Sequence, residues 1–167
     1  NHNEPVADTD DKFDLAALEM TLIGADIRNE NIVESEHNIQ EGVINFYASN
    51  LTDNALGLRK SKQLTIKNIY PGIDWILKTN DDKGFKYDFI VYPGADISNI
   101  KFEYKGQTKA VFSNDKRYLT LSTPLGEISE GPLYCYQDNQ EVLSHWKLND
   151  NSYSITIDNY DPSKKIV

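Results

Sequence analysis

The sequence predicts an all-β protein: an antiparallel β-sandwich of about ten short strands with little or no helix. Three observations support this. Short apolar or alternating runs are separated by turn residues about every 8 to 12 positions. The chain carries 10 Tyr and 6 Phe, and together with its β-branched residues these suit a pleated, half-buried surface. A regular alternation of strand and helix patterns, which a parallel sheet requires, is absent.

The length and composition fit a single domain. A chain of 167 residues with 39% hydrophobic content is long enough to form one core, and two independent domains are not expected. Residues 1–14 are polar and acidic without periodicity, which predicts a flexible lead-in. Their carboxylates lack the central Gly and distal Glu of a calcium-binding loop. Residues 15–167 are expected to form one β-sandwich domain.

The first ordered element is ambiguous. Residues 15–24 (LAALEMTLIG) contain good helix formers, yet Leu18, Met20 and Leu22 alternate, so a strand is favoured. The remaining expected strands follow in order, each bounded by Gly, Pro, Asn or Asp: 43–49, 64–70, 75–79, 85–92, 100–106, 109–113, 118–123, 131–137, 142–148 and 152–158.

Charge and motif content exclude several classes of function. The net charge of −9 argues against nucleic acid and anionic membranes as partners. No apolar run reaches the ~20 residues that cross a bilayer, so no membrane span is expected. The single cysteine, Cys135, forbids an intrachain disulfide, and the three histidines lack metal-ligand spacing. We therefore expect no catalytic residue, metal or cofactor, although the two carboxylates of a glycosidase carry no short motif and that alternative stays open.

The central segment predicts a β-hairpin around the loop 80–84. Pairing Asn80 with Gly84 sets apolar side chains opposite one another, and a shift by one residue would mix the two faces. This register puts five side chains on one face, which is expected to be the core of the hairpin: Trp75, Leu77, Phe85, Tyr87 and Phe89.

The opposite face of the hairpin is charged. Asp74 and Asp88 are expected as diagonal neighbours within reach of Lys78 and Lys86. The four side chains fit either a charge network or half of a cation site. A network is favoured, because a cation needs more than two oxygen ligands.

The motif Tyr-Pro-Gly-x-Asp occurs twice, before and after this hairpin. Pro presets φ and Gly supplies the positive φ that a type II turn requires. A short acidic side chain near a turn accepts hydrogen bonds from backbone N–H groups. Six residues are therefore expected to shape two turns rather than two active sites: Pro71, Gly72, Asp74, Pro93, Gly94 and Asp96.

Several motifs in order resemble the β-rich domain that precedes SBBP-type β-propeller repeats in large secreted Bacteroidota proteins. These motifs are GAD (24–26), INFYASN (44–50), YPGID (70–74), KYDFIVYPGADI (86–97), LGE (125–127), PLYCYQ (132–137) and YDPSKKIV (160–167). Lys86 and Ile97 depart from the family pattern. The strands that precede the GAD-like motif in the family are missing, so the resemblance also allows a fragment or trimmed form of that domain.

This resemblance implies a non-catalytic module of a secreted, cell-surface multidomain protein, often exported by the type IX system and associated with adhesion. Its expected partners are other domains of the parent protein or a surface-assembly protein. A carbohydrate-binding module is the alternative, since sandwiches present flat aromatic faces to sugars. The aromatic residues considered as ligand-facing are Tyr92, Tyr104, Tyr134, Tyr136 and Trp146.

Overall fold

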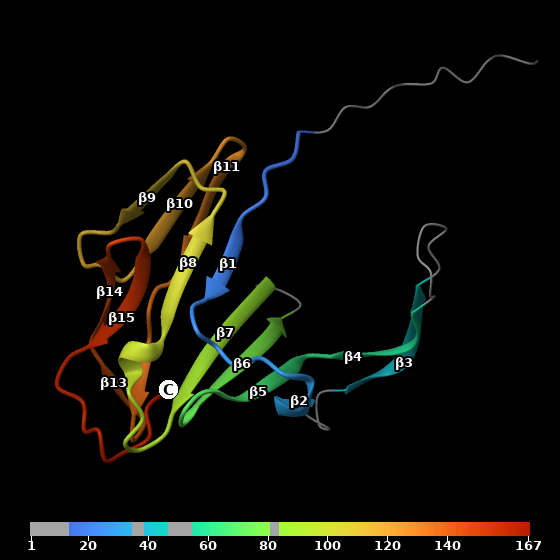
Figure 1. Ribbon diagram of the computed structural model, residues 1–167, viewed down its shortest axis with the longest axis horizontal. Coiled ribbons are helices and arrows are strands. Elements are labelled where there is room, and N and C mark those ends of the chain that lie inside the picture. The colour runs from blue at the N-terminus through green and yellow to red at the C-terminus, as the bar shows by residue number, and fades with distance from the viewer. Residues whose placement is uncertain (1–13, 35–38, 47–54, 81–83) are drawn as a thin grey trace, which may run out of the picture.

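The computed structural model describes residues 14–34, 39–46, 55–80 and 84–167 (Figure 1). The expected all-β class is confirmed. In the described residues the helical elements are two single turns, η1 (Asn29–Asn31) and η3 (Ile97–Asn99). No helix among them is long and apolar enough to cross a membrane. The expected lead-in lies outside the described residues except for Asp14.

The N-terminal segment forms a strand, as favoured, although the strand is short. β1 (Glu19–Leu22) pairs antiparallel with β8, opposing Leu22 to Phe102 and Met20 to Tyr104. It is the edge of a four-stranded sheet of order β1-β8-β15-β14, whose other strands are β8 (Lys101–Lys105), β15 (Ser152–Ile157) and β14 (Ser144–Asn149).

Two smaller antiparallel sheets pack against this one. The three-stranded sheet comprises β11 (Gly126–Glu130), β10 (Leu119–Thr123) and β9 (Lys109–Phe112). The two-stranded one comprises β12 (Cys135–Gln137) and β13 (Gln140–Val142). In β10 the buried Leu119 and Leu121 alternate with a more exposed residue, as in a strand with a single buried face.

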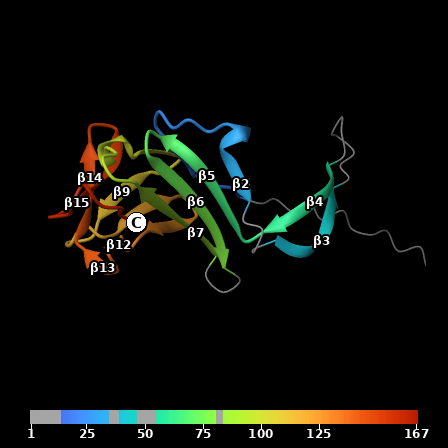
Figure 2. The same cartoon turned by 90° about the horizontal axis from the view of Figure 1, so that it is seen from below.

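A second four-stranded sheet, of order β2-β5-β6-β7, runs obliquely to the first (Figures 1 and 2). It contains the central hairpin, and its strands are β2 (Ile32–Glu34), β5 (Gln63–Tyr70), β6 (Ile73–Asn80) and β7 (Gly84–Val91). A separate antiparallel pair with register shifts consists of β3 (Ile39–Phe46) and β4 (Ala55–Ser61).

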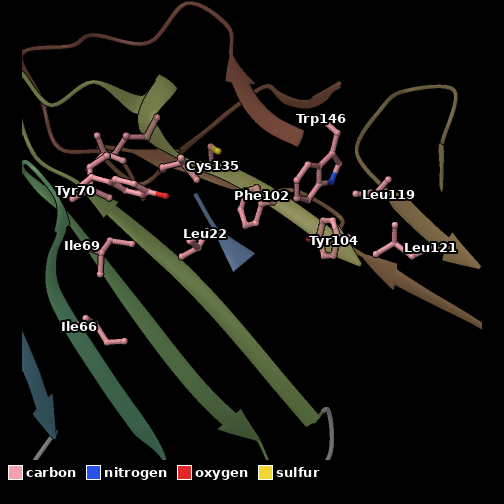
Figure 3. Packing of buried hydrophobic residues seen from close by; sticks show 14 residues of the cluster. Leu22, Ile66, Ile69, Tyr70, Phe102, Tyr104, Leu119, Leu121, Cys135 and Trp146 are labelled. Carbon is pink, nitrogen blue, oxygen red and sulfur yellow. The ribbon is translucent and has the colours of Figure 1, made fainter. Parts of the chain in front are cut away.

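The core lies where the sheets meet, and Phe102 of β8 is at its centre (Figure 3). The Phe102 ring is 5.3 Å from the Trp146 ring of β14 and 5.9 Å from the Phe89 ring of β7, centroid to centroid. Both contacts are edge-to-face, the arrangement that aromatic quadrupoles favour. One aromatic side chain therefore couples the two four-stranded sheets.

Residues 166 and 167 connect the sheet that contains β7 with the sheet that contains β12. Ile166 exchanges two backbone hydrogen bonds with Val91 at the end of β7, at 2.9 and 3.0 Å. Val167 exchanges two with Tyr136 of β12, at 2.7 and 3.0 Å. Residues 166–167 thus form a short extended piece held between β7 and β12, and Figure 1 marks this terminus beside the end of β7.

Candidate functional site: the aromatic face and open edge of the β6–β7 hairpin

The hairpin has the expected register. Asn80 opposes Gly84, and Trp75, Leu77 and Thr79 oppose Phe89, Tyr87 and Phe85. Apolar side chains thus line one face along both strands, as the alternation predicted. This inner face looks toward Phe102.

The two Tyr-Pro-Gly turns flank this hairpin and touch each other. Tyr70 pairs with Ile73, so Pro71 and Gly72 make the turn from β5 to β6, and Gly72 has φ +71°. The second turn contains Gly94 at φ +80°. It folds back on the first, because the Tyr92 N–H donates to the Gly72 carbonyl at 2.9 Å. Each glycine thus supplies the positive φ that a side chain disfavours.

Both aspartates of the repeated motif accept hydrogen bonds from the backbone. Asp74 is buried and accepts from the Asn68 N–H at 2.8 Å and from the Tyr92 hydroxyl at 3.1 Å. Asn68 has φ +50° and lies where the β5–β6 register shifts, so the carboxylate holds an irregular point of the ladder. Asp96 accepts from the Ser98 N–H at 2.9 Å and caps η3, and these bonds lower the pKa of its carboxyl.

The charged face is a network around Asp88. Lys78 Nζ pairs with Asp88 Oδ2, and Lys86 Nζ lies 3.6 Å from Asp88 Oδ1. The expected companion Asp74 is not part of it, because its two carboxylate oxygens are taken by Asn68 and Tyr92. One carboxylate between two lysines is a charge network of the ordinary cross-strand kind.

The inner aromatic face is only half covered. The Trp75 and Phe89 rings stack at 6.2 Å with their planes 10° apart, and the Tyr87 ring meets both edge-on. These three and Leu77 are half-buried against the core cluster. Phe85 was expected in the core and is instead 61% exposed. It is the second residue of β7, at the loop end of the hairpin.

A polar cluster lies at the inner end of this face. The Tyr87 hydroxyl donates to Glu130 Oε2 of β11 at 2.9 Å. Burial raises the pKa of the Glu130 carboxyl, and the hydrogen bonds of Tyr87 and Tyr104 oppose that shift. Nε1 of Trp75 is buried without a hydrogen-bond partner among the described residues, which is uncommon in a closed core.

Sequence reasoning missed Glu130. The signal was present, because Ile128 and Glu130 alternate on the same face of a strand whose partner positions, Leu121 and Leu119, are fully buried. Ile128 is nevertheless 48% exposed, so this pattern identifies the face on which Glu130 lies but not its burial.

Among the described residues, the outer edge of β7 is paired at Val91. Val91 N–H bonds outward to Ile166, while Tyr92 N–H bonds inward to Gly72. Because backbone groups in an antiparallel ladder alternate in direction, the N–H and C=O of Phe85, Tyr87 and Phe89 also point outward. In the described residues, β7 has β6 as its strand partner, and its pairing on the other edge is the single bridge to Ile166.

The aromatic residues considered as ligand-facing separate into two groups. Tyr104 and Trp146 are 5% and 2% exposed, so that prediction is wrong for both: they oppose other inward-facing residues and complete the core. Tyr92 is partly exposed, although its hydroxyl is bound to Asp74.

Tyr134 and Tyr136 are exposed, as a ligand-facing role requires. They lie two residues apart around β12, and their rings are 6.4 Å apart with planes 20° from parallel. The Arg117 guanidinium carbon lies 5.0 Å from the centre of the Tyr134 ring, a cation–π contact. Arg117 also pairs with Glu141 at 2.7 Å.

The described residues include one cysteine and one histidine. Cys135 is buried, and burial raises the pKa of its thiol, which disfavours a nucleophilic thiolate. His145 lies 2.8 Å from Asp158 at the surface, whereas His2 and His37 lie outside the described residues. Within the described ranges, no group of three His, Cys, Asp or Glu side chains is arranged to hold a metal ion.

The comparison with known proteins gives a family without an assigned activity. The model of a family described as a domain of unknown function (DUF7948) matches residues 1–167, the full length given. Neither a curated protein nor a solved structure matches the chain. No residue role can be transferred from a relative, so the function must be inferred from the geometry of the site.

Proposed function

We propose that this chain, which belongs to the DUF7948 family of domains of unknown function, is a non-catalytic module that binds another polypeptide. One observation carries the proposal: the aromatic inner face of the β6–β7 hairpin, half-buried at Trp75 and Tyr87, continues into an exposed Phe85. This ring lies beside a strand edge that has no partner at Phe85 among the described residues. Aromatic residues are enriched in the cores of protein interfaces.

The energetics favour a partner at this place. Covering apolar surface stabilises a complex by about 25 cal/mol per Å², so an exposed phenyl ring and half-exposed neighbours together offer a few kcal/mol. An uncovered strand edge beside apolar side chains also carries an aggregation risk unless it is occupied or blocked. Occupation by a partner accounts for both features.

The cellular context is part of the proposal and depends on the sequence resemblance. The module acts in a secreted, cell-surface protein of adhesion or surface-assembly type, of the kind that Bacteroidota export by the type IX system. Its partner is a neighbouring domain or a protein of the same assembly. Cell fractionation tests this: recovery of the parent protein in the cytoplasm alone would contradict it.

The binding proposal is tested in the intact parent protein by chemical cross-linking at the native cell surface. Phe85→Ser removes an exposed ring, whereas Leu125→Ser removes an exposed apolar side chain from the β10–β11 turn and serves as the matched control. We expect the cross-linked partner to be lost with Phe85→Ser and kept with Leu125→Ser. Equal recovery of the cross-linked partner with both variants would show that the hairpin face is not part of the interface.

A second candidate, glycan binding, is favoured by Tyr134 and Tyr136. Two exposed, nearly parallel tyrosine rings beside an Arg117–Glu141 pair offer sugar-stacking surface and polar groups together. A glycan array with wild type and with Tyr134→Ala/Tyr136→Ala distinguishes this function. Binding that is lost in the double variant supports it, and the absence of binding across surface and plant glycans contradicts it.

A further inference from the structure

The first four-stranded sheet has a hollow on the face that points away from the core. Side chains alternate between the two faces of a strand, and Phe102 and Trp146 point into the core. Their neighbours Lys101 and Lys147 therefore point to the opposite face, over the adjacent strands β8, β15 and β14 (Figure 1). The hollow has a volume of about 680 Å³, which is within the usual range of small-ligand sites.

The hollow forms because β15 carries a short side chain between two long ones. Ser154 of β15 opposes Lys101 of β8 on one side and Lys147 of β14 on the other. Opposed Cβ atoms of neighbouring strands lie about 5 Å apart, so the two lysines begin about 10 Å apart with the serine between them. All three residues line the hollow.

Ser154 lies at the bottom of the hollow and is 7% exposed. Its Oγ accepts a hydrogen bond from Asn149 Nδ2 at 2.7 Å, which fixes the position of the hydroxyl. A serine hydroxyl that accepts a hydrogen bond still has its own O–H to donate. In the part of the chain that the structure describes, this O–H has no acceptor. One donor is therefore free at the bottom of the hollow.

The two lysines add positive charge on either side of that donor. Both are exposed, and neither forms an ion pair with another described residue. Two nearby carboxylates have other partners: Glu103 pairs with Lys105 at 3.1 Å, and Asp96 accepts from a backbone N–H of η3. The ammonium groups of Lys101 and Lys147 are thus available to an anion above Ser154.

We infer that this hollow binds a hexuronate, a sugar that carries one carboxylate, with the carboxylate between Lys101 and Lys147 and above Ser154. Hydrogen bonds from ammonium groups to a carboxylate are about twice as strong as those between neutral groups. The inference goes beyond the proposed binding of a polypeptide. It shares no residue with the hairpin site or with the Tyr134 and Tyr136 surface.

The rest of the lining suits the hydroxyl groups of a sugar better than an inorganic anion. Ser152 opposes Asn149 in the next row, and the carboxylates of Glu103 and Asp150 also line the hollow. Carboxylate and amide oxygens accept hydrogen bonds from hydroxyl groups, which sulfate and chloride lack. Tyr160, partly buried against the core cluster, adds an aromatic surface for the C–H groups of a sugar ring.

The charge of the whole chain favours a single carboxylate over a polyanion. A net charge of −9 repels a polymer with many negative charges at long range. One carboxylate is repelled far less, and it meets two lysines within the hollow. The site is therefore expected to select a single acidic sugar unit.

The test is an NMR titration of the full chain, observed at the backbone amides, with three probes at constant ionic strength. Sodium glucuronate carries both the carboxylate and the hydroxyl groups, glucose lacks the carboxylate, and sodium sulfate lacks the sugar. We expect glucuronate to shift the amides of Lys101, Lys147 and Ser154 with a Kd of about 1 mM. Glucose and sulfate should each bind about tenfold more weakly or less.

Three variants locate the carboxylate. Lys101→Gln and Lys147→Gln each remove one ammonium group and should weaken glucuronate binding by about tenfold, while the weak binding of glucose stays the same. Lys109→Gln is the matched control, because Lys109 is an exposed lysine of β9 that does not line the hollow. It changes the net charge equally and should leave the affinity for glucuronate unchanged. The amide spectrum of each variant without ligand checks its folding.

Four results would overturn the inference. The first is the absence of glucuronate-dependent shifts at Lys101, Lys147 and Ser154. The second is equal affinity for glucose, which would leave the lysines without a role. The third is equal affinity for sulfate, which would mean that the hollow attracts an adventitious ion only. The fourth is an equal loss of affinity in Lys109→Gln, which would assign the effect to the overall charge of the chain.

Discussion

The Tyr92 hydroxyl donates a hydrogen bond to the buried carboxylate of Asp74 at 3.1 Å. The tyrosine of the second Tyr-Pro-Gly motif is thereby bound to the aspartate of the first. Because Asp74 also accepts from the Asn68 N–H, one carboxylate connects a β5 irregularity, the start of β6 and the end of β7. The repeated motif therefore stabilises the turn end of the β6–β7 hairpin, and this hairpin is the site of the proposed function.

Removing the Tyr92 hydroxyl should lower the stability of the fold modestly. Tyr92→Phe loses one hydrogen bond to a charged group, and we expect the free energy of unfolding to fall by about 1–2 kcal/mol. Asp74→Ala should cost more, about 2–4 kcal/mol, because it leaves the Asn68 N–H without its partner as well. Urea titration of both variants and of the double variant measures their coupling. Additive losses would show that the Tyr92–Asp74 bond contributes nothing.

The two motif glycines form a matched pair for substitution. Both have positive φ, so alanine at either position strains the backbone by about 1 kcal/mol. A Cβ on Gly72 would in addition lie 3.0 Å from the Ala95 Cβ, whereas a Cβ on Gly94 meets nothing within 4 Å. Thermal melts should therefore show Gly72→Ala to be the more destabilised variant. The reverse order would mean that the second turn does not pack on the first.

The hairpin register, both turn glycines and the all-β class could be predicted from the sequence because each depends on local pattern. Side-chain alternation sets the register, and Pro-Gly sets the turn. Exposure could not be predicted in the same way. Phe85 and Phe89 follow the same alternation, yet only Phe89 reaches Phe102, because the crossing of the two four-stranded sheets decides which end of the hairpin is covered.

The same limit applies to the polar residues of the site. Asp74 and Asp88 share a hairpin face, and nothing local distinguishes them. The structure distinguishes them: Asp74 accepts from the N–H of Asn68, a positive-φ residue within β5, and from the Tyr92 hydroxyl, while Asp88 pairs with two lysines. The local sequence likewise does not distinguish Trp146 and Tyr104 from exposed aromatic residues. Both are buried because their strands, β14 and β8, are distant in sequence but contribute to the same core.

The half-buried Glu130 should make the stability of the fold depend on pH in a definite direction. Burial raises the pKa of its carboxyl, and the titratable groups facing it are Tyr87 of β7 and Tyr104 of β8. Below the unfolded-state pKa the carboxyl is protonated in both states and costs nothing. As the pH rises through the higher folded-state pKa, the folded state must bury a charge and loses stability.

Glu130→Gln removes this dependence. We expect the stability of the variant relative to wild type to increase between pH 4 and pH 7, measured by urea titration at each pH. Glu127→Gln is the matched control on the exposed side of the same strand, and its relative stability should stay constant over this range. A relative stability of Glu130→Gln that falls as the pH rises would show that the folded state stabilises the charged carboxylate.

Ile166 should be important for stability despite its place at the end of the chain. Its side chain is 1% exposed, and its backbone pairs with Val91. Ile166→Ala should lower the free energy of unfolding by about 2–4 kcal/mol. Val167→Ala, at a residue that is 38% exposed, should cost below about 1 kcal/mol. Equal losses in chemical denaturation would mean that the side chain of Ile166 is not part of the core.

Variants of the two phenylalanines of β7 distinguish a contribution to folding stability from a contribution to binding. Phe89→Ala removes a ring that contacts Phe102 and should cost about 3 kcal/mol. Phe85→Ser removes an exposed ring and should change stability by less than about 0.5 kcal/mol, because few core contacts are lost. It should also reduce self-association in light scattering, since an apolar group beside an open strand edge promotes aggregation. A loss of several kcal/mol in Phe85→Ser would instead assign that ring to the core and remove the argument for a partner.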